Sequence, residues 1–235
     1  MTLSLSAPLA GWCAPLEEVP DEVFATRMLG DGVALDPVSS VLCAPCDGEV
    51  ILLAATRHAL TLRTTEGAEI LMHVGLETVA LGGTGFAPAV SQGQRVRRGD
   101  ALLRFDLDLL ARRARSLLTP VIVNADGRWR IARRALACEV AVGDFLMELE
   151  PSGAAAAPAA PGGTPAIGRR LTLALVHGLH ARPAALVATA LGPFDAEVRV
   201  QRGERSANAR STVALMALGA RHGEVLELEA RGADA

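Results

Sequence analysis

A histidine and an arginine at the start of a predicted helix carry the strongest chemical signal in this 235-residue chain. Residues 177–183 read HGLHARP, and alanine-rich sequence follows. Because proline suits the first turn of a helix, the pattern predicts a helix that begins near Pro183, with His180 at its N-terminus. Backbone N–H groups at a helix N-terminus attract anions, and Arg182 adds a fixed positive charge. The sequence therefore predicts that His180 accepts a phosphoryl group, and simple helix capping is the alternative.

A second pair of histidines indicates the same chemistry. His58 begins one apolar run and His73 ends the next, and the turn at Glu66 and Gly67 joins the two runs. A hairpin would place both rings on one face if His58 and His73 pair directly. One ring could then take a phosphoryl group while the other donates an N–H to its oxygens, and Thr56 could select the tautomer of His58. Two core histidines, or a metal site with further ligands, are the alternatives.

The N-terminal part of the chain has the pattern of an all-β sandwich or barrel. Short aliphatic runs broken by turn residues predict strands over residues 48–55, 58–64 and 68–74. The motif V-x-x-G-D-x-L occurs at residues 96–102 and again at 140–146, and each copy predicts a strand, a Gly-Asp turn and a second strand. Residues 108–115 are expected to form one amphipathic helix.

Residues 151–168 divide the chain into two expected domains. This stretch is dominated by Ala, Pro and Gly and has no charged residue, which is typical of a linker. We therefore expect domains over residues 1–150 and 169–235. The second is predicted to be an α+β open-faced sandwich, with helices at 183–191 and 208–217, strands at 171–176, 196–201 and 224–230, and a strand or turn at 203–206.

Composition excludes several classes of protein. Residues 1–150 hold 14 Arg and 19 acidic residues, and residues 169–235 hold 9 Arg and 7 acidic residues, so neither domain is basic enough to predict nucleic-acid binding. The longest wholly apolar run, 50–55, is far too short to span a membrane, and we expect a cytoplasmic protein. Cys43 and Cys46 form a CxxC motif without a second pair, so structural thiols are favoured over redox or metal chemistry.

The segment around His180 resembles HPr, the histidine phosphocarrier of the bacterial phosphoenolpyruvate-dependent sugar phosphotransferase system. The resemblance is carried by GLHARPAA at 178–185, RSANARS at 205–211 and GEV at 223–225. It implies that His180 is phosphorylated, with Arg182 as its neutralising partner. His177 stands where the family usually has Asn. Ser206 stands at the family's regulatory serine, although a serine at a helix start is more often an N-cap. The resemblance also implies one more helix after residue 235, and we expect the domain to be truncated and marginally stable without it.

Residues 6–150 are similar to the glucose-family enzyme IIA of the same system. The matching segments include PLEEVPD at 15–21, MLGDGVA at 28–34, HA at 58–59, GAEILMHVGLETV at 67–79 and GQRV at 93–96. The resemblance implies that His73 is phosphorylated, that His58 is its hydrogen-bonding partner and that Thr56 orients His58. Glu77 replaces the Asp of many relatives, which leaves the chemistry intact and could alter partner contacts.

Together the two resemblances imply a phosphohistidine relay with no intrinsic cofactor. The phosphoryl group of phosphoenolpyruvate would pass from enzyme I to His180, then to His73, and on to the IIB domain of a glucose or N-acetylglucosamine transporter. Expected partners are enzyme I, separate or originally fused after the HPr-like domain, and transporter IIB/IIC components, with only peripheral contact to the membrane transporter. The alternative is a regulatory binding module whose phosphorylation state controls transporters or other partners.

Overall fold

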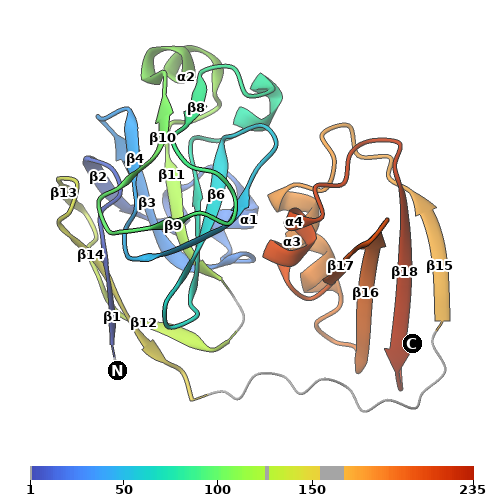
Figure 1. The fold of residues 1–235 in the computed structure, drawn as a ribbon. Coiled ribbons are helices and arrows are strands. Elements are labelled where there is room, and N and C mark those ends of the chain that lie inside the picture. Colours follow the sequence, from blue (N-terminus) through green and yellow to red (C-terminus); the bar gives the residue numbers. More distant parts are fainter. Residues whose placement is uncertain (1, 125–126, 154–166) are drawn as a thin grey trace. The chain divides into compact units, whose positions relative to one another are not determined.

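The chain forms two compact units in a computed structural model that describes residues 2–124, 127–153 and 167–235. The two units are Met1–Ala154 and Ala155–Ala235 (Figure 1). Residues 154–166 of the predicted linker lie outside the described residues. At the margins of that linker, Pro151 ends strand β14, and residues 167–168 begin strand β15.

The N-terminal unit contains three antiparallel sheets, which confirms the predicted β class. The largest sheet has the strand order β13-β2-β3-β11-β7-β6-β5-β9. Its strands are, in chain order, β2 (Gly11–Pro15), β3 (Gly30–Pro37), β5 (Gly48–Leu53), β6 (Ala59–Thr64), β7 (Glu69–His73), β9 (Arg95–Val96), β11 (Thr119–Asn124) and β13 (Cys138–Val140).

Two three-stranded sheets and four short helical segments complete this unit. One sheet has the order β1-β14-β12 and the other β4-β10-β8. Their strands are β1 (Leu3–Ser6), β4 (Val41–Cys43), β8 (Phe86–Pro88), β10 (Ala101–Phe105), β12 (Trp129–Arg134) and β14 (Phe145–Pro151). The helical segments are η1 (Leu16–Glu18), α1 (Glu22–Ala25), η2 (Thr78–Leu81) and α2 (Leu107–Arg113), the last close to the predicted helix.

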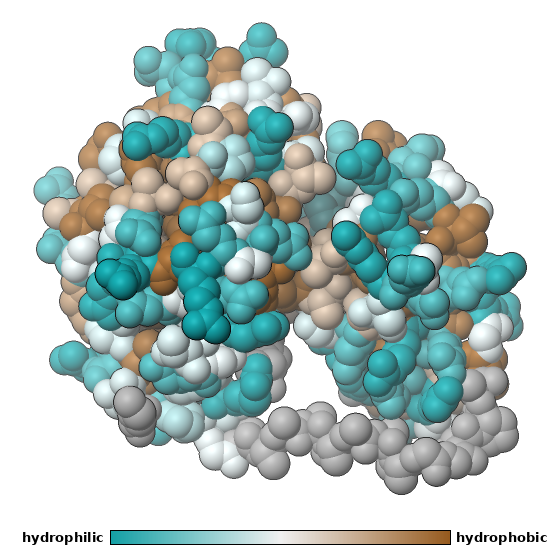
Figure 2. Space-filling view, in the orientation of Figure 1, coloured by the Kyte–Doolittle hydropathy of each residue, from teal (hydrophilic) through white to brown (hydrophobic). Residues whose placement is uncertain are grey.

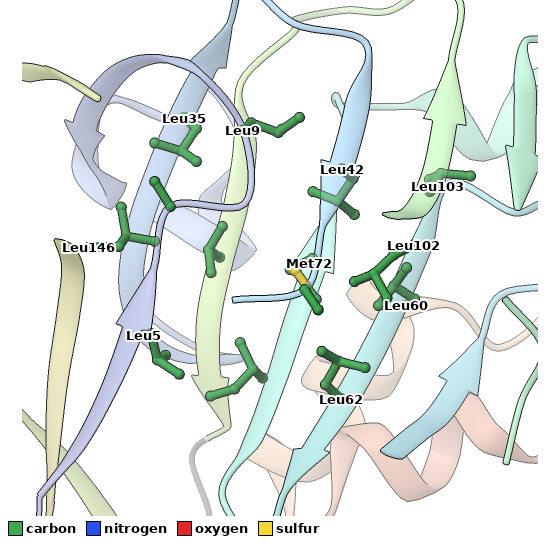
Figure 3. Close-up of a cluster of buried hydrophobic side chains, with 14 of the residues drawn as sticks. Leu5, Leu9, Leu35, Leu42, Leu60, Leu62, Met72, Leu102, Leu103 and Leu146 are labelled. Carbon is green, nitrogen blue, oxygen red and sulfur yellow. The ribbon is translucent and has the colours of Figure 1, made fainter. Parts of the chain in front are cut away.

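Aliphatic side chains from all three sheets meet in one core. Figure 3 shows Leu60, Leu62 and Met72 of the β6–β7 hairpin beside Leu42 and Leu102, which come from β4 and β10. All five side chains are fully buried. Burial of one such side chain stabilises the fold by ~1.5–3 kcal/mol. The hairpin that carries the histidines is therefore anchored firmly on its core side.

The two copies of V-x-x-G-D-x-L form equivalent turns. Asp100 accepts a hydrogen bond from the N–H of Arg97, and Asp144 accepts one from the N–H of Ala141, each at 2.8 Å. Gly99 and Gly143 have φ of +87° and +94°, a region that favours glycine. Each turn leads from a strand of the eight-stranded sheet, β9 or β13, into a three-stranded sheet through β10 or β14.

The C-terminal unit is an antiparallel four-stranded sheet with two helices on one side, which confirms the predicted α+β class (Figure 1). The sheet order is β15-β18-β16-β17. The elements are β15 (Ile167–Thr172), α3 (Ala181–Ala190), β16 (Ala196–Arg202), β17 (Arg205–Asn208), α4 (Thr212–Ala217) and β18 (Val225–Gly232).

Two expected boundaries in this unit were wrong. The first strand is β15 rather than residues 171–176, because register with β18 pairs Ile167 with Ala230 and ends at Thr172 with Val225. The second helix begins at Thr212 rather than 208, because residues 205–208 pair with β16 instead. Apolar content favoured the later start of the strand, but cross-strand pairing decides which backbone joins a sheet.

One face of the C-terminal sheet is polar. Register places Ser206 opposite Gln201, Gln201 opposite Glu227, and Glu227 opposite Arg170. Arg170 and Glu227 form an exposed ion pair at 2.6 Å. Hydrophilic residues also cover much of this unit in the space-filling view (Figure 2). Marginal stability of the unit stays a prediction. In the described ranges, no helix combines the length and apolar character needed to cross a bilayer.

Candidate phosphohistidine sites

The β6–β7 hairpin brings His58 and His73 together, although not through the direct pairing that we expected. Register pairs His73 with Ala59, and the N–H of Val74 donates to the carbonyl of His58 at 2.8 Å. His58 lies one residue before β6, directly after Arg57, whose φ is +61°. Because His58 precedes the pleated strand, its side chain is not bound by the alternation that would send neighbouring residues to opposite faces. The two rings therefore meet despite an offset of one residue.

The rings of His58 and His73 are in edge-to-face contact. Their centroids are 4.6 Å apart and their planes cross at 76°. Only 4% of His58 and 7% of His73 is exposed. The ring of Phe24, from α1, packs 5.3 Å from that of His73. Sequence analysis did not single out Phe24 as a site residue, because nothing local connects residue 24 with the hairpin.

The hydrogen bond of His73 assigns its neutral tautomer. Nδ1 of His73 lies 2.8 Å from the carbonyl oxygen of Gly75. A carbonyl oxygen can only accept, so Nδ1 carries the proton and donates it. In the neutral ring, Nε2 then carries the lone pair. The geometry thus makes Nε2 of His73 the nucleophilic nitrogen.

Thr56 holds the ring of His58. The Thr56 hydroxyl lies 2.6 Å from Nδ1 of His58. If the hydroxyl donates to Nδ1, the ring proton of neutral His58 is on Nε2, where it can serve as a donor to an anion. The threonine therefore has the contact that sequence analysis expected of an orienting residue.

The loop after His73 is fixed by backbone geometry. Gly75 has φ of +65°, and a Cβ there would lie 3.0 Å from Cγ2 of Thr78 and 3.1 Å from the carbonyl of Ser116. The hydroxyl of the buried Thr78 donates to the carbonyl of Val74 at 2.9 Å. Glu77 is exposed and forms a 3.4 Å ion pair with Arg115. The carbonyl of Gly75, which accepts from Nδ1 of His73, therefore lies in a constrained loop. The side chain of Glu77 faces solvent.

The second site lies at the N-terminus of α3. His180 is the N-cap residue, and its backbone carbonyl accepts from the N–H of Ala184 at 3.0 Å. Gly178 has φ of +73°, and a Cβ there would lie 2.3 Å from the carbonyl of Ala220. That same carbonyl accepts from the N–H of Leu179 at 2.9 Å. Only glycine allows this close approach, which fixes the entry of the chain into the helix.

His180 occupies the N-cap position of α3 without using its side chain as a cap. It makes no side-chain cap hydrogen bond, and its side chain is partly exposed. The simple capping alternative is therefore wrong for the side chain. Arg182 is exposed in the first turn of α3, so its charge and the positive end of the helix act together at this terminus. The His177 ring lies 6.5 Å from the His180 ring, centroid to centroid.

Ser206 does not begin a helix. It lies exposed in β17, opposite Gln201, on the polar face of the sheet. The serine that starts a helix is Ser211, whose hydroxyl accepts from the N–H of Ala214 at 3.2 Å and caps α4. The N-cap reading of Ser206 was therefore wrong. Sequence spacing missed Ser211, since the helix was expected to begin at residue 208, which is the last residue of β17.

The four cysteines are free thiols. Burial raises the pKa of Cys46 to about 12, and burial together with nearby Cys138 raises that of Cys13 to about 12. Burial also raises the pKa of Cys43. These shifts disfavour the reactive thiolates that redox chemistry would use. Within the ranges that the structure describes, no three His, Cys, Asp or Glu side chains are grouped so as to hold a metal ion.

Each unit therefore places an imidazole where an anionic group could bind, His73 at the end of β7 and His180 at the N-terminus of α3. Residues 3–128 match the family described as "phosphoenolpyruvate-dependent sugar phosphotransferase system, EIIA 1", and residues 167–235 match "PTS HPr component phosphorylation site". The chain belongs to this EIIA family, and it carries an HPr component after the EIIA domain. It is a phosphotransferase component of the sugar phosphotransferase system.

Similar proteins support this assignment. A glucose-specific EIIA component from Bacillus cereus is 50% identical over 121 residues, which cover 52% of this chain and 73% of that protein. One from Halalkalibacterium halodurans is 42% identical over 138 residues, which cover 59% of this chain and 80% of that protein. The solved structure of glucose permease IIA from Mycoplasma capricolum superposes with a TM-score of 0.60 at 40% identity, covering 63% of this chain and 96% of that one.

Proposed function

We propose that this protein passes a phosphoryl group from enzyme I to His180, from His180 to His73, and from His73 to the IIB domain of a sugar transporter. The observation that carries the proposal is the tautomer of His73. Its Nδ1 donates to the carbonyl of Gly75 at 2.8 Å, which leaves the lone pair on Nε2. The HPr component supplies the preceding carrier, since a family of phosphorylation sites matches residues 167–235.

Transfer to His73 needs no redox step. The Nε2 lone pair of His73 forms a bond to phosphorus, the P–N bond to the donor imidazole breaks, and its electron pair returns to the donor ring nitrogen. Most of the catalysis comes from in-line positioning and from neutralising the phosphoryl oxygens. His58 supplies an N–H to those oxygens at His73. At His180, Arg182 and the N-terminus of α3 supply positive charge.

The names of the relatives support a proposal for the partners and the substrate. Proteins named glucose-specific EIIA are 42–50% identical to the N-terminal domain, so we propose a transporter for glucose or a related sugar such as N-acetylglucosamine as the acceptor. Phosphoenolpyruvate, through enzyme I, is the proposed source. We place the relay in the cytoplasm, as the resemblance to these carriers implies.

The experiment is phosphorylation of the full chain by enzyme I and labelled phosphoenolpyruvate, with the variants His73→Ala and His180→Ala. We expect label on both histidines of the unchanged chain, label on His180 alone in His73→Ala, and no label in His180→Ala. His222→Ala removes another exposed imidazole of the same domain as a control and should label like the unchanged chain. Label on His73 in His180→Ala, with no other HPr present, would contradict the order.

Mixing the two variants tests whether transfer occurs between chains. Labelled His73→Ala can serve only as donor, and unlabelled His180→Ala only as acceptor. If label moves between them as fast as within the unchanged chain, and in proportion to concentration, transfer between chains is the working route. Adding a membrane fraction with the cognate transporter and glucose then tests the final step. Retention of label on His73 there would favour a regulatory binding module instead.

A further inference from the structure

His177 is a second imidazole beside the proposed acceptor of the C-terminal domain. The rings of His177 and His180 have centroids 6.5 Å apart, with planes crossing at 66°. His177 is exposed and His180 is partly exposed. The N-terminal domain holds its own pair, His58 and His73, at 4.6 Å and 76°. Each domain therefore presents two imidazoles at a steep angle, and the pair beside His180 is the wider one.

The backbone of the turn that carries His177 and His180 is constrained. The N–H of Gly178 donates to the carbonyl of Leu175 at 2.9 Å, and the N–H of His180 donates to the carbonyl of Gly178 at 3.1 Å. A Cβ at Gly178 would collide with the carbonyl of Ala220, so this turn is packed against a neighbouring loop. His177 is thus attached to a constrained turn that leads directly into α3.

The separation suits a ligand between the rings. Ring nitrogens lie about 1 Å from the ring centre, so nitrogens of rings centred 6.5 Å apart are too far apart for a direct hydrogen bond of about 2.7–3.2 Å. A phosphoryl group bonded to one ring projects its oxygens into such a gap. The second ring can then reach an oxygen with its N–H.

We propose that His177 donates a hydrogen bond to the phosphoryl group on His180 and so acts as a phosphoryl-binding residue. This inference rests on the proposed phosphorylation of His180. Arg182 supplies charge from the first turn of α3, while His177 supplies a directed N–H from the preceding turn. The HPr-like site would then have a donor imidazole, as the EIIA site has in His58. In the family to which the segment is similar, Asn usually stands at this position, so His177→Asn offers a substitution that keeps an N–H donor.

The test uses the full chain with His73→Ala, so that label stays on His180. In this parent we would compare His177, His177→Asn and His177→Ala under limiting enzyme I. We expect the initial rate of labelling to fall about tenfold in His177→Ala, because one donor to the phosphoryl oxygens is lost. His177→Asn should stay within about threefold of the parent. His222→Ala is the matched control for loss of an exposed imidazole, and circular dichroism checks that each variant folds.

A second readout separates phosphoryl contact from docking of enzyme I. After enzyme I is removed, we would measure the hydrolysis half-life of phosphorylated His180 at a fixed pH. A donor to the phosphoryl oxygens stabilises the phosphorylated form, so the half-life should shorten at least twofold in His177→Ala and be retained in His177→Asn. Equal labelling in His177→Ala and the parent would overturn the inference, as would slower labelling with an unchanged half-life, or an Asn variant as impaired as the Ala variant. Failure of the parent to label would instead overturn the proposed function.

Discussion

The rings of His58 and His73 lie edge to face with centroids 4.6 Å apart, and each is held through Nδ1 by a different kind of group. His73 donates to a backbone carbonyl, which fixes its tautomer, whereas His58 meets a hydroxyl, which can donate or accept. The pair is therefore chemically unequal. One ring is arranged as a nucleophile, and the other can present a proton to the group that the first ring takes up.

Removing the Thr56 hydroxyl should impair transfer without unfolding the domain. Thr56→Val keeps the side-chain shape and loses the 2.6 Å contact to Nδ1 of His58. We expect the rate of phosphoryl transfer to His73 to fall about tenfold, since the ring of His58 loses its orienting partner. Thr56→Ser keeps a hydroxyl and should retain most of the rate. Equal rates in Thr56→Val and the unchanged chain would show that the hydroxyl does not orient the ring.

Replacing Gly75 should disturb the acceptor itself. Gly75→Ala would force a Cβ to within 3.0 Å of Thr78 and would strain a residue whose φ is +65°. We expect the domain to lose ~1–3 kcal/mol of unfolding free energy and His73 to accept phosphoryl groups more slowly, because the carbonyl bound to Nδ1 shifts.

Gly82→Ala is the matched control for this glycine. Gly82 has a similar φ of +59°, but a Cβ there would meet nothing within 4 Å. It should cost stability through backbone strain alone and leave the transfer rate unchanged. Denaturant unfolding and labelling assays on the two variants separate the effects. A normal transfer rate in folded Gly75→Ala would show that the carbonyl position is not critical.

The Asp31–Arg134 ion pair should make stability depend on acid pH. Burial opposes ionisation of Asp31, but the hydrogen bonds and charge of Arg134, followed by the N–H of Gly32 and the charge of Arg27, outweigh it and lower the pKa of Asp31. Because the folded-state pKa lies below the ordinary value of about 3.9, the pair contributes stability above that pH and loses it as pH falls through the folded-state value. The guanidinium bridges β12 and β3, with Nη1 of Arg134 2.7 Å from Oδ1 of Asp31.

We expect Arg134→Ala to lower the unfolding free energy by ~1 kcal/mol at pH 7. Its difference from the unchanged chain should shrink as pH falls below the ordinary aspartate pKa of about 3.9 and vanish once pH is below the lowered folded-state pKa of Asp31. Arg130→Ala, which removes an ion pair from an arginine whose side chain is 64% exposed, should have little effect at either pH. Urea unfolding across pH 3–7 provides the measurement. A difference that grows as pH falls would contradict the assigned direction.

Two of the four cysteines should resist modification. Burial raises the pKa of Cys13 and of Cys46 to about 12, so few thiolates form at neutral pH. Alkylation of the native protein at pH 8, followed by peptide mapping, should label Cys43 and Cys138 first. Denaturant should make all four equally reactive. Rapid labelling of Cys13 or Cys46 in the native protein would show that its burial is transient.

Local sequence determined the type of most elements and the identity of both proposed acceptors. Gly178 and Pro183 mark a turn and a helix start by their own backbone restrictions, so α3 and the place of His180 could be predicted. The Gly-Asp turns were predictable for the same reason. For His73, family resemblance rather than periodicity favours a phosphoryl acceptor over a core histidine.

Long-range pairing decided what the sequence could not. Three features of the structure depend on contacts between different segments of the chain. They are the register that pairs His73 with Ala59, the contact of the Phe24 ring with the His73 ring, and the pairing of residues 205–208 with β16. Sheet register is selected by the total burial and hydrogen bonding of all the paired strands, and no short stretch of sequence contains that information. The sequence determined which imidazoles could carry a phosphoryl group, and the tertiary structure decided which nitrogen of His73 bears the lone pair and how far the neighbouring rings lie from the two proposed acceptors.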